Sequence, residues 1–309
     1  MATNEARDRL PELRDGMPIS PAEAAYRAAY RKVLQTTDSD SDPPSVLYHY
    51  TDAPGLLGIL KTRELWATNA LYMNDAQEVH HGHNLAREFI KKNLAEDSPT
   101  YRNLRRGLGY LSAMVSEQPN VNNYVVSFCA EPDVLSQWRA YADRGTGFAI
   151  GFDRIALPEA IAVQDNSNFL ESTFPVVYGE QLQQRLLSES AVATGQYCGM
   201  SDLHWGDLRY WINMVLKCKH PLFREEKEWR LSIVRLLQGD NRPSFRTKDR
   251  QIVPYTPIKF RPNAVVSVHV GPTTEPELAR RVVRDLLRYE GHNSARTIEI
   301  SRVPLRLPG

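Results

Sequence analysis

Residues 123–152, NYVVSFCAEPDVLSQWRAYADRGTGFAIGF, predict two strands with one short helix between them. The strands are expected at 123–129 and 147–152, and the helix is expected to end near Tyr141. Trp138 and Tyr141 stand three residues apart, on one side of that helix. Such a short connection differs from the even strand–helix alternation of a doubly wound parallel sheet. The stretch therefore favours an α+β fold with a mixed, largely antiparallel β-sheet core.

The rest of the chain adds further strands and two helical insertions to this core. Strands are predicted at 46–51, 65–67, 174–178, 227–234, 264–270 and 297–303. Shorter helices are predicted around the leucines at 56, 57 and 60, and at 277–289. Two longer helical insertions are predicted at about 77–117 and 179–218.

The first 44 residues read as an extension of the main domain. A capping box, Ser20 to Glu23, begins a helix over about 21–35. An acidic, proline-ending linker, TTDSDSDPP, follows and ends at Pro44. We therefore expect an N-terminal extension at 1–44 and one α+β catalytic-like domain at 45–309, with the two insertions inside it.

Composition excludes several classes of protein. Lys plus Arg is 38 and Asp plus Glu is 37, so the net charge is +1 and gives no overall attraction to nucleic acid or anionic lipid. The N-terminus lacks the apolar segment of a signal peptide, and no apolar run is long enough to cross a membrane. The three cysteines are an odd number without a C-x-x-C pair, which argues against a disulfide scaffold or a zinc ribbon. These features predict a soluble, cytoplasmic protein.

Two acids and an arginine alternate in the late strand EKEWRLSI, residues 226–233. Side chains alternate across a strand, so one face is expected to carry Glu226, Glu228, Arg230 and Ser232. The opposite face carries Trp229 and Leu231 and is suited to burial. The plain alternative is a solvent-facing strand in which an arginine stands among acids.

His49 lies in the first core strand and shares a face with Leu47 and Thr51. One alternative makes it a hydrogen-bonded core residue, and the other makes it a functional imidazole. Trp138 and Tyr141 likewise suit either packing or a stacking wall for a flat ring.

Other chemistry finds little support in the sequence. His80, His81 and His83 have metal-ligand composition, but their spacing places only the outer two near one side of a helix. Neither a Walker A motif nor a G-x-G-x-x-G follows any predicted strand, and Ser127 lacks a G-x-S-x-G elbow. We expect no metal cofactor.

Several strings along the chain are familiar when taken together. They are LYHYT at 47–51, LWA at 65–67, MNDAQE at 73–78, VSF at 126–128, WRAY at 138–141, GFAIGF at 147–152, KHPLFREEKEWR at 219–230, VGP at 270–272 and SRVPLR at 301–306. In this order, from about residue 46 to 306, they resemble the bacterial domain-of-unknown-function 2971 family. That family name implies no chemistry.

A looser resemblance does imply chemistry. A His in the first strand, an aromatic helix after a Ser-bearing strand and a late E-x-E are similar to the ADP-ribosyltransferase superfamily. The closest type has a His-Tyr-Glu triad, as in diphtheria-like toxins and poly-ADP-ribose polymerases. The resemblance implies an ADP-ribosyltransferase-like fold in which His49 anchors the NAD ribose, Tyr141 stacks on nicotinamide and Glu228 binds a ribose hydroxyl.

The same resemblance extends the expected NAD-binding set. Glu226 would be the leading acid of the E-x-E, and Ser127 would support the ribose from the second strand. Trp138 is the alternative stacking residue. Thr51, beside His49, and Arg230, beside Glu228, complete the set. The pyrophosphate needs cationic partners, and the sequence does not choose among Arg139, Arg144, Lys217 and Lys219.

The leading hypothesis is an NAD-dependent ADP-ribosyltransferase or NAD glycohydrolase, with NAD as substrate and an unknown protein or nucleic-acid acceptor. Breaking the nicotinamide–ribose bond develops positive charge on the ribose, which a fixed carboxylate stabilises. A toxin or phage-defence effector with an antitoxin or defence-system partner is one form of this hypothesis. The alternatives are a non-catalytic nucleotide or ADP-ribose sensor or regulatory module, and an interaction domain that docks through helix 21–35.

Overall fold

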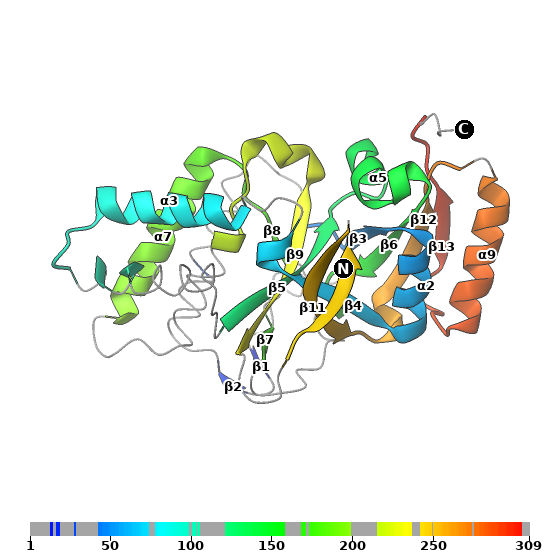
Figure 1. Cartoon of the computed structure of the whole chain (residues 1–309), viewed down its shortest axis with the longest axis horizontal. Helices are drawn as coiled ribbons and strands as arrows, with labels where there is room; N and C mark the ends of the chain where they lie inside the picture. Colours follow the sequence, from blue (N-terminus) through cyan, green and yellow to red (C-terminus); the bar gives the residue numbers. More distant parts are fainter. Residues whose placement is uncertain are drawn as a thin grey trace, which may run out of the picture. The chain divides into compact units, whose positions relative to one another are not determined.

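The chain divides into two units, each described here by itself. The computed structural model describes residues 13–14, 17–18, 28, 43–73, 78–98, 101–102, 104–105, 121–157, 168–170, 173–198, 215–236, 242–248, 250–273 and 275–304. Unit 1 takes in residues 1–41, 77–119 and 177–221 (Figure 1). Unit 2 takes in residues 42–76, 120–176 and 222–309. Both predicted helical insertions thus fall in unit 1.

Unit 1 is mainly helical in its described part. Its two long helices are α3 (Glu78–Asn93) and α7 (Glu180–Cys198), which contact each other. Two short strands, β1 (Leu13–Arg14) and β2 (Met17–Pro18), pair antiparallel. The predicted N-terminal helix at 21–35 lies outside the described residues apart from position 28. No helix in the described ranges has the length and apolar character needed to cross a membrane.

Unit 2 is built on a sheet that has eleven strands among the described residues. The strands are β3 (Val46–Thr51), β4 (Glu64–Asn69), β5 (Val121–Cys129), β6 (Phe148–Asp153), β7 (Asn168–Leu170), β8 (Phe174–Pro175), β9 (Glu228–Leu236), β10 (Ser244–Lys248), β11 (Gln251–Lys259), β12 (Val265–Val270) and β13 (Thr297–Ile300). The main order is β10-β11-β4-β5-β3-β6-β12-β13, and β9 pairs with β5, β7 and β8. Among these eleven described strands, only β12 and β13 pair in parallel. The predicted α+β class with a mixed, mostly antiparallel sheet is confirmed.

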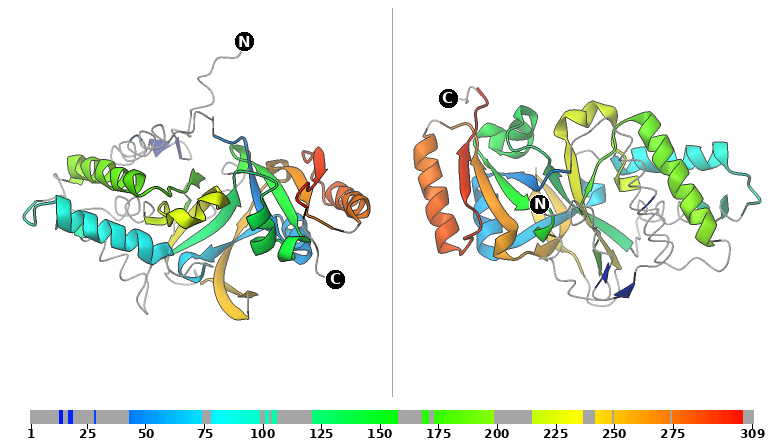
Figure 2. Two further views of the ribbon diagram at one scale, coloured as in Figure 1. Left: turned by 90° about the horizontal axis from the view of Figure 1, so that it is seen from above. Right: turned by 180° about the vertical axis from the view of Figure 1, so that it is seen from behind.

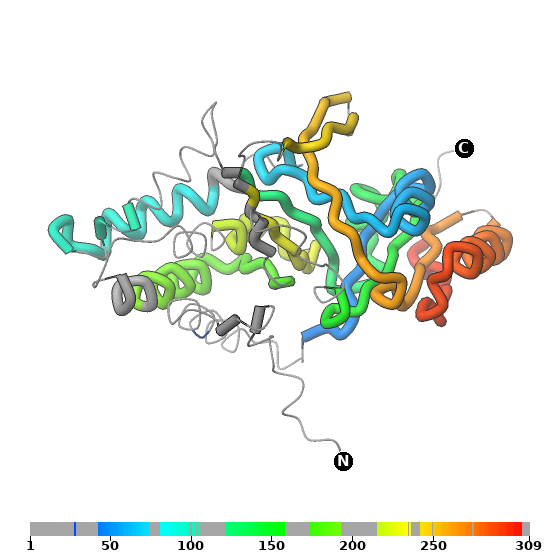
Figure 3. Tube along the Cα trace, turned by 90° about the horizontal axis from the view of Figure 1, so that it is seen from below, coloured from blue at the N-terminus to red at the C-terminus, as the bar shows by residue number. Residues whose placement is uncertain are grey.

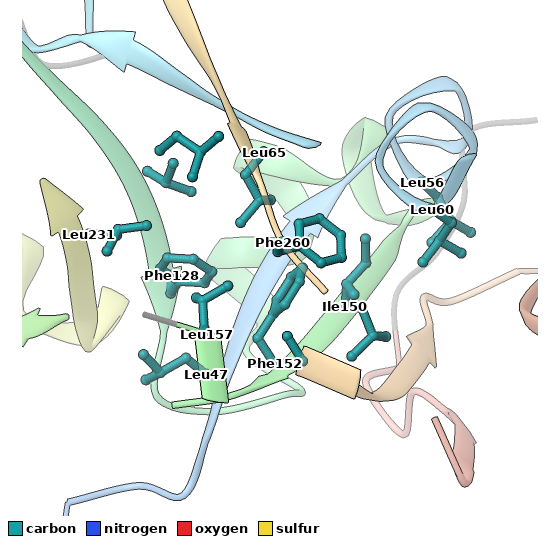
Figure 4. Packing of buried hydrophobic residues seen from close by; sticks show 14 of the residues in the cluster. Leu47, Leu56, Leu60, Leu65, Phe128, Ile150, Phe152, Leu157, Leu231 and Phe260 are labelled. Atoms are coloured by element: carbon teal, nitrogen blue, oxygen red, sulfur yellow. The ribbon is translucent and has the colours of Figure 1, made fainter. Parts of the chain in front are cut away.

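Helices cover the two faces of this sheet differently (Figure 2). One face packs the main core, where α2 (Ala53–Thr62) contributes Leu56 and Leu60 (Figure 4). Helix α9 (Pro276–Tyr289) contributes Val283 and Leu287 to the same core. The other face carries α5 (Leu135–Tyr141), whose Trp138 packs with residues of β3, β5 and β6. We call these the core face and the α5 face. Short 3-10 turns complete the unit: η2 (Ala70–Tyr72), η3 (Asp143–Gly145), η4 (Pro221–Glu226) and η5 (Pro262–Ala264).

Local backbone conformation explains where prediction and structure differ. The strand predicted at 227–234 begins at Glu228, because Lys227 has a left-handed φ of 44° that interrupts an extended chain. The strand predicted at 297–303 ends at Ile300, and the one at 174–178 covers only Phe174–Pro175. The β10–β11 hairpin was not predicted; its chain path runs out from the rest of the sheet (Figure 3).

Candidate functional site

The strands that carry the expected site residues are neighbours in the sheet. β5 pairs with β3 through Tyr48↔Cys129 and with β9 along its whole length. Cys129 lies opposite Glu228, and Ser127 lies opposite Arg230. Residues directly opposite each other in an antiparallel pair point to the same face. Cys129 packs with Trp138, so Glu228, Arg230 and Ser127 all belong to the α5 face.

Glu228 and Arg230 form a buried, bidentate ion pair. Arg230 Nε donates to Glu228 Oε1 at 2.8 Å, and Arg230 Nη2 donates to Glu228 Oε2 at 2.9 Å. The relative exposure of the side chains is 5% for Glu228 and 1% for Arg230. Bidentate arginine–carboxylate pairs are the strongest and most directional of the charge-assisted hydrogen bonds. The alternative of a solvent-facing strand is therefore wrong. The prediction from alternating side chains that Glu228 and Arg230 share one face of the strand is confirmed.

Glu226 does not belong to the strand. It is the last residue of η4, and the left-handed Lys227 separates it from β9. The expectation that Glu226 and Glu228 alternate on one face of a single strand is therefore wrong. Glu226 instead accepts a long hydrogen bond of 3.5 Å from the Tyr141 hydroxyl at the end of α5. This contact brings two expected site residues together beside the α5 face.

His49 points away from Glu228. Its opposite residue on β6 is Ile150, which belongs to the main core. Because opposite residues of an antiparallel pair point to the same face, His49 lies on the core face. The ring lies 5.8 Å from that of Phe128, edge to face. The side chains of His49, Tyr141 and Glu228 therefore do not converge on one face of the sheet.

The His49 imidazole nevertheless contacts the edge of β5. On one edge of β5, Tyr124 and Val125 pair with β4, and Cys129 pairs with β3. Residues 126–128 of β5 therefore have no strand partner on this edge among the described residues. His49 Nδ1 lies 3.0 Å from the Ser127 carbonyl oxygen in that gap. A carbonyl only accepts, so Nδ1 carries the proton and Nε2 of the neutral ring is an acceptor.

The surroundings of His49 keep the ring neutral. Burial is the main cause that lowers the pKa of His49, and the hydrogen bond to Ser127 opposes it. The positive charges of Arg246 and Lys248 lower this pKa further. Both residues belong to β10, so the hairpin acts electrostatically on the gap at β5.

Trp138 is a core residue. Its side chain is 0% exposed, its Nε1 donates to Asp133 Oδ1 at 2.7 Å, and its ring meets Tyr50 edge to face at 4.8 Å. The proposal that Trp138 stacks on a bound ring is wrong, because no face of the indole is open. Tyr141 is half-buried and remains the candidate for the aromatic residue that stacks on a bound ring.

The remaining expected residues take supporting positions. Thr51 ends β3, half-buried, opposite Phe148. Ser127 is half-buried on the α5 face. Burial raises the pKa of the neighbouring Cys129 thiol to about 12, so it is not a thiolate near neutral pH.

Histidine ligation of a metal finds no support in the described part of the chain, which holds no cluster of three or more candidate ligands. His81 Nε2 lies 3.3 Å from Gln183 Oε1, and its ring is 5.8 Å from that of His220. The side chain of His80 lies outside the described residues.

The hairpin carries a cluster of side chains that was not predicted from the sequence. Arg246 of β10 lies over the stacked rings of Trp66 on β4 and Tyr255 on β11. The signal in the sequence was the alternation of polar and apolar residues in SFRTK and QIVPYT, on either side of a short polar turn, which is typical of a β-hairpin. The prolines at 254 and 257 obscured it, because proline inside a run argues against a strand.

Comparisons with known proteins bear on part of this region. No curated protein and no solved structure matches the chain. Residues 137–231 match the model of a family described as a protein of unknown function, DUF2971. This stretch contains Tyr141, Glu226, Glu228 and Arg230, and it leaves His49 and Ser127 outside. By sequence, the segment from α5 to the first residues of β9 is therefore similar to the DUF2971 family.

Proposed function

We propose that unit 2 binds NAD and breaks its nicotinamide–ribose bond, transferring ADP-ribose to an acceptor or to water. The observation that supports this most is the adjacency of three strands, β3, β5 and β9, which carry His49, Ser127 and Glu228. His49 is bonded to the Ser127 backbone, and Ser127 lies opposite Arg230. The order of residue types across these strands is the one that the resemblance to ADP-ribosyltransferases implies.

Glu228 has the properties that such a reaction requires. The reaction builds positive charge on the ribose, and a pre-oriented anion with little water around it stabilises that charge. Arg230 donates to both oxygens of the Glu228 carboxylate. The pair therefore fixes the direction in which the Glu228 carboxylate points on the α5 face.

His49 and Tyr141 would act as positioning residues in this proposal. Neutral His49 offers Nε2 as an acceptor, which suits the hydroxyl of a ribose. The Tyr141 hydroxyl is bonded to Glu226, which orients the ring at the edge of the α5 face. We extend the proposal to a toxin or phage-defence effector, with a protein or nucleic-acid acceptor and an antitoxin or other defence-system partner.

A second function, nucleotide or ADP-ribose binding without turnover, is favoured by two specific observations. His49 and Glu228 point to opposite faces of the sheet. Arg230 also neutralises Glu228 through both carboxylate oxygens. A regulatory or sensor module would need the same fold and nucleotide site but no free carboxylate.

Release of nicotinamide from NAD by the full chain tests the proposal. The expected result is measurable release that falls at least a hundredfold in Glu228→Gln, because one transition-state charge contact is lost. Glu225→Gln is the matched control, since Glu225 is an exposed acid in the neighbouring η4 turn. His49→Asn keeps a donor near the Nδ1 position but loses Nε2, and should raise KM for NAD more than it lowers kcat.

Binding measurements on the same proteins separate the two functions. NAD binding that is equal in the wild type and Glu228→Gln, with no release by either, supports the sensor. Absence of both binding and release refutes both functions. Thermal unfolding of each variant shows whether a loss of activity reflects loss of the fold, since Glu228→Gln also leaves the buried Arg230 without its main carboxylate.

A further inference from the structure

Three side chains on β4, β10 and β11 form a compact cluster of two rings and one cation. The rings of Trp66 and Tyr255 stack with centroids 4.5 Å apart and an interplanar angle of 29°. The guanidinium carbon of Arg246 lies 5.6 Å from the centroid of Trp66 and 5.8 Å from that of Tyr255. Trp66 is 42% exposed, which is unusual for a tryptophan in a sheet and leaves part of its ring open.

The charge of Arg246 is only partly satisfied. Arg246 Nη2 donates to Thr68 Oγ1 at 2.7 Å, which is a neutral acceptor. Its Nε is buried and has no hydrogen-bond partner. Among the described residues no carboxylate pairs with this guanidinium, and burial lowers its pKa, with Tyr255 acting in the opposite direction. A half-buried cation held in this way is suited to an anion.

The cluster lies on the same face of the sheet as Glu228. Arg246 is opposite Val253, and Tyr255 is opposite Thr68. Thr68 is opposite Val125, which is opposite Ser232 on β9. Parity therefore places Arg246, Trp66 and Tyr255 on the α5 face with Arg230 and Glu228. Thr68, which Arg246 contacts, is two strand spacings from β9, or about 10 Å.

We infer that Arg246 binds a phosphate group of a nucleotide whose base stacks on the exposed part of the Trp66 ring. This inference rests on the proposed function, and it names the phosphate-binding part of that site. A planar guanidinium that pairs with no carboxylate among the described residues suits phosphate oxygens. An exposed ring beside it suits a flat base. Lys248 stands two residues after Arg246 on the same face of β10 and adds positive charge.

Calorimetric titration of the full chain with adenosine, ADP and NAD tests this inference. The wild type should bind ADP and NAD more tightly than adenosine. Arg246→Gln should weaken ADP and NAD at least tenfold and leave adenosine unchanged, because only the phosphate contact is lost. Arg242→Gln removes an exposed charge two residues before the start of β10 and should behave as the wild type.

Trp66→Leu provides a second variant in case Arg246→Gln fails to fold. It removes an exposed ring and keeps the charge, so it should weaken adenosine and ADP by the same factor. Thermal unfolding of both variants identifies a purely structural role: a lowered Tm with unchanged ADP affinity would overturn the inference. Equal losses in Arg242→Gln and Arg246→Gln would also overturn it, since overall charge would then explain them.

Two further outcomes separate this inference from the proposed function. ADP binding that depends on Arg246 supports the inference even in a protein that releases no nicotinamide. Nicotinamide release with the same KM for NAD in the wild type and Arg246→Gln refutes the inference and leaves the proposed function standing. Binding of a single-stranded oligonucleotide through Arg246 without binding of ADP would assign the cluster to nucleic acid and overturn it.

Discussion

The buried carboxylate of Glu228 is balanced by the guanidinium of Arg230, two residues further along the same strand. The relative exposure of these side chains is 5% and 1%, so both charges have left bulk water. Such a pair adds little net stability, because desolvation offsets most of the attraction. Removal of one partner from a buried ion pair is costly in general, on the order of 3–5 kcal/mol, because the remaining charge loses its main counter-charge.

Histidine burial leads to a prediction about stability and pH. Burial lowers the pKa of both His49 and His269 from the ordinary value of 6.5. Below pH 6.5 the unfolded chain therefore binds protons that the folded protein does not bind. The free energy of unfolding should fall as pH drops from about 7.5 to 5.5, by up to about 1.4 kcal/mol per pH unit for each histidine.

Urea denaturation at a series of pH values measures this slope. His49→Asn removes one titrating group and keeps a donor for the Ser127 carbonyl, so its slope should be shallower over this range. An unchanged slope in His49→Asn would show that other groups cause the pH dependence.

At the scale of elements, local signals predicted the helices better than the hairpin. The helix around Leu56 and Leu60 was predicted from apolar spacing, and the structure places it at Ala53–Thr62. Asp52 begins this helix by accepting from Gly55 N at 2.7 Å, and left-handed Arg63 ends it. The β10–β11 hairpin instead has two prolines in β11, Pro254 and Pro257, and proline within a run argues against a strand.

Helix α2 contains a glycine that allows a sharp test of helix propensity. An added Cβ at Gly58 would meet nothing within 4 Å, and this residue is exposed in mid-helix. Gly58→Ala should therefore raise the free energy of unfolding by about 1 kcal/mol. Gly55→Ala is the contrasting variant, because its Cβ would lie 2.0 Å from Thr51 Oγ1. Urea denaturation of both variants gives the comparison, and a destabilised Gly58→Ala would contradict this assignment of α2.

At the scale of the whole molecule, the sheet of unit 2 depends on close approach of backbone segments from distant parts of the sequence. Gly147 donates its N–H to Ala142 O at 2.9 Å, and its own carbonyl accepts from Gly271 N at 2.9 Å. An added Cβ at Gly147 would lie 2.3 Å from the Thr51 carbonyl oxygen. The ends of β3, α5 and β12 thus meet at one glycine.

Gly147→Ala should therefore destabilise unit 2. We expect the free energy of unfolding to fall by about 1–3 kcal/mol, because backbone atoms of Thr51 and Ala142 must move to make room for the added methyl group. Chemical denaturation measures this change, and Gly58→Ala is the control in which the same methyl group meets no neighbour. A neutral Gly147→Ala would show that the three segments separate easily.

The sequence by itself determined the α+β class, most strands and helices, and the alternation that puts Glu228 and Arg230 on one face. These properties follow from period and local conformation, which neighbouring residues specify. Only the tertiary structure decided that β3, β5 and β9 are adjacent, that Trp138 is sealed in the interior and that His49 faces away from Glu228. His49 and Ser127 are 78 residues apart in the chain, and strand order and register arise from packing across such separations. No local pattern carries that information, which is why the hairpin cluster of Arg246, Trp66 and Tyr255 emerged only from the folded chain.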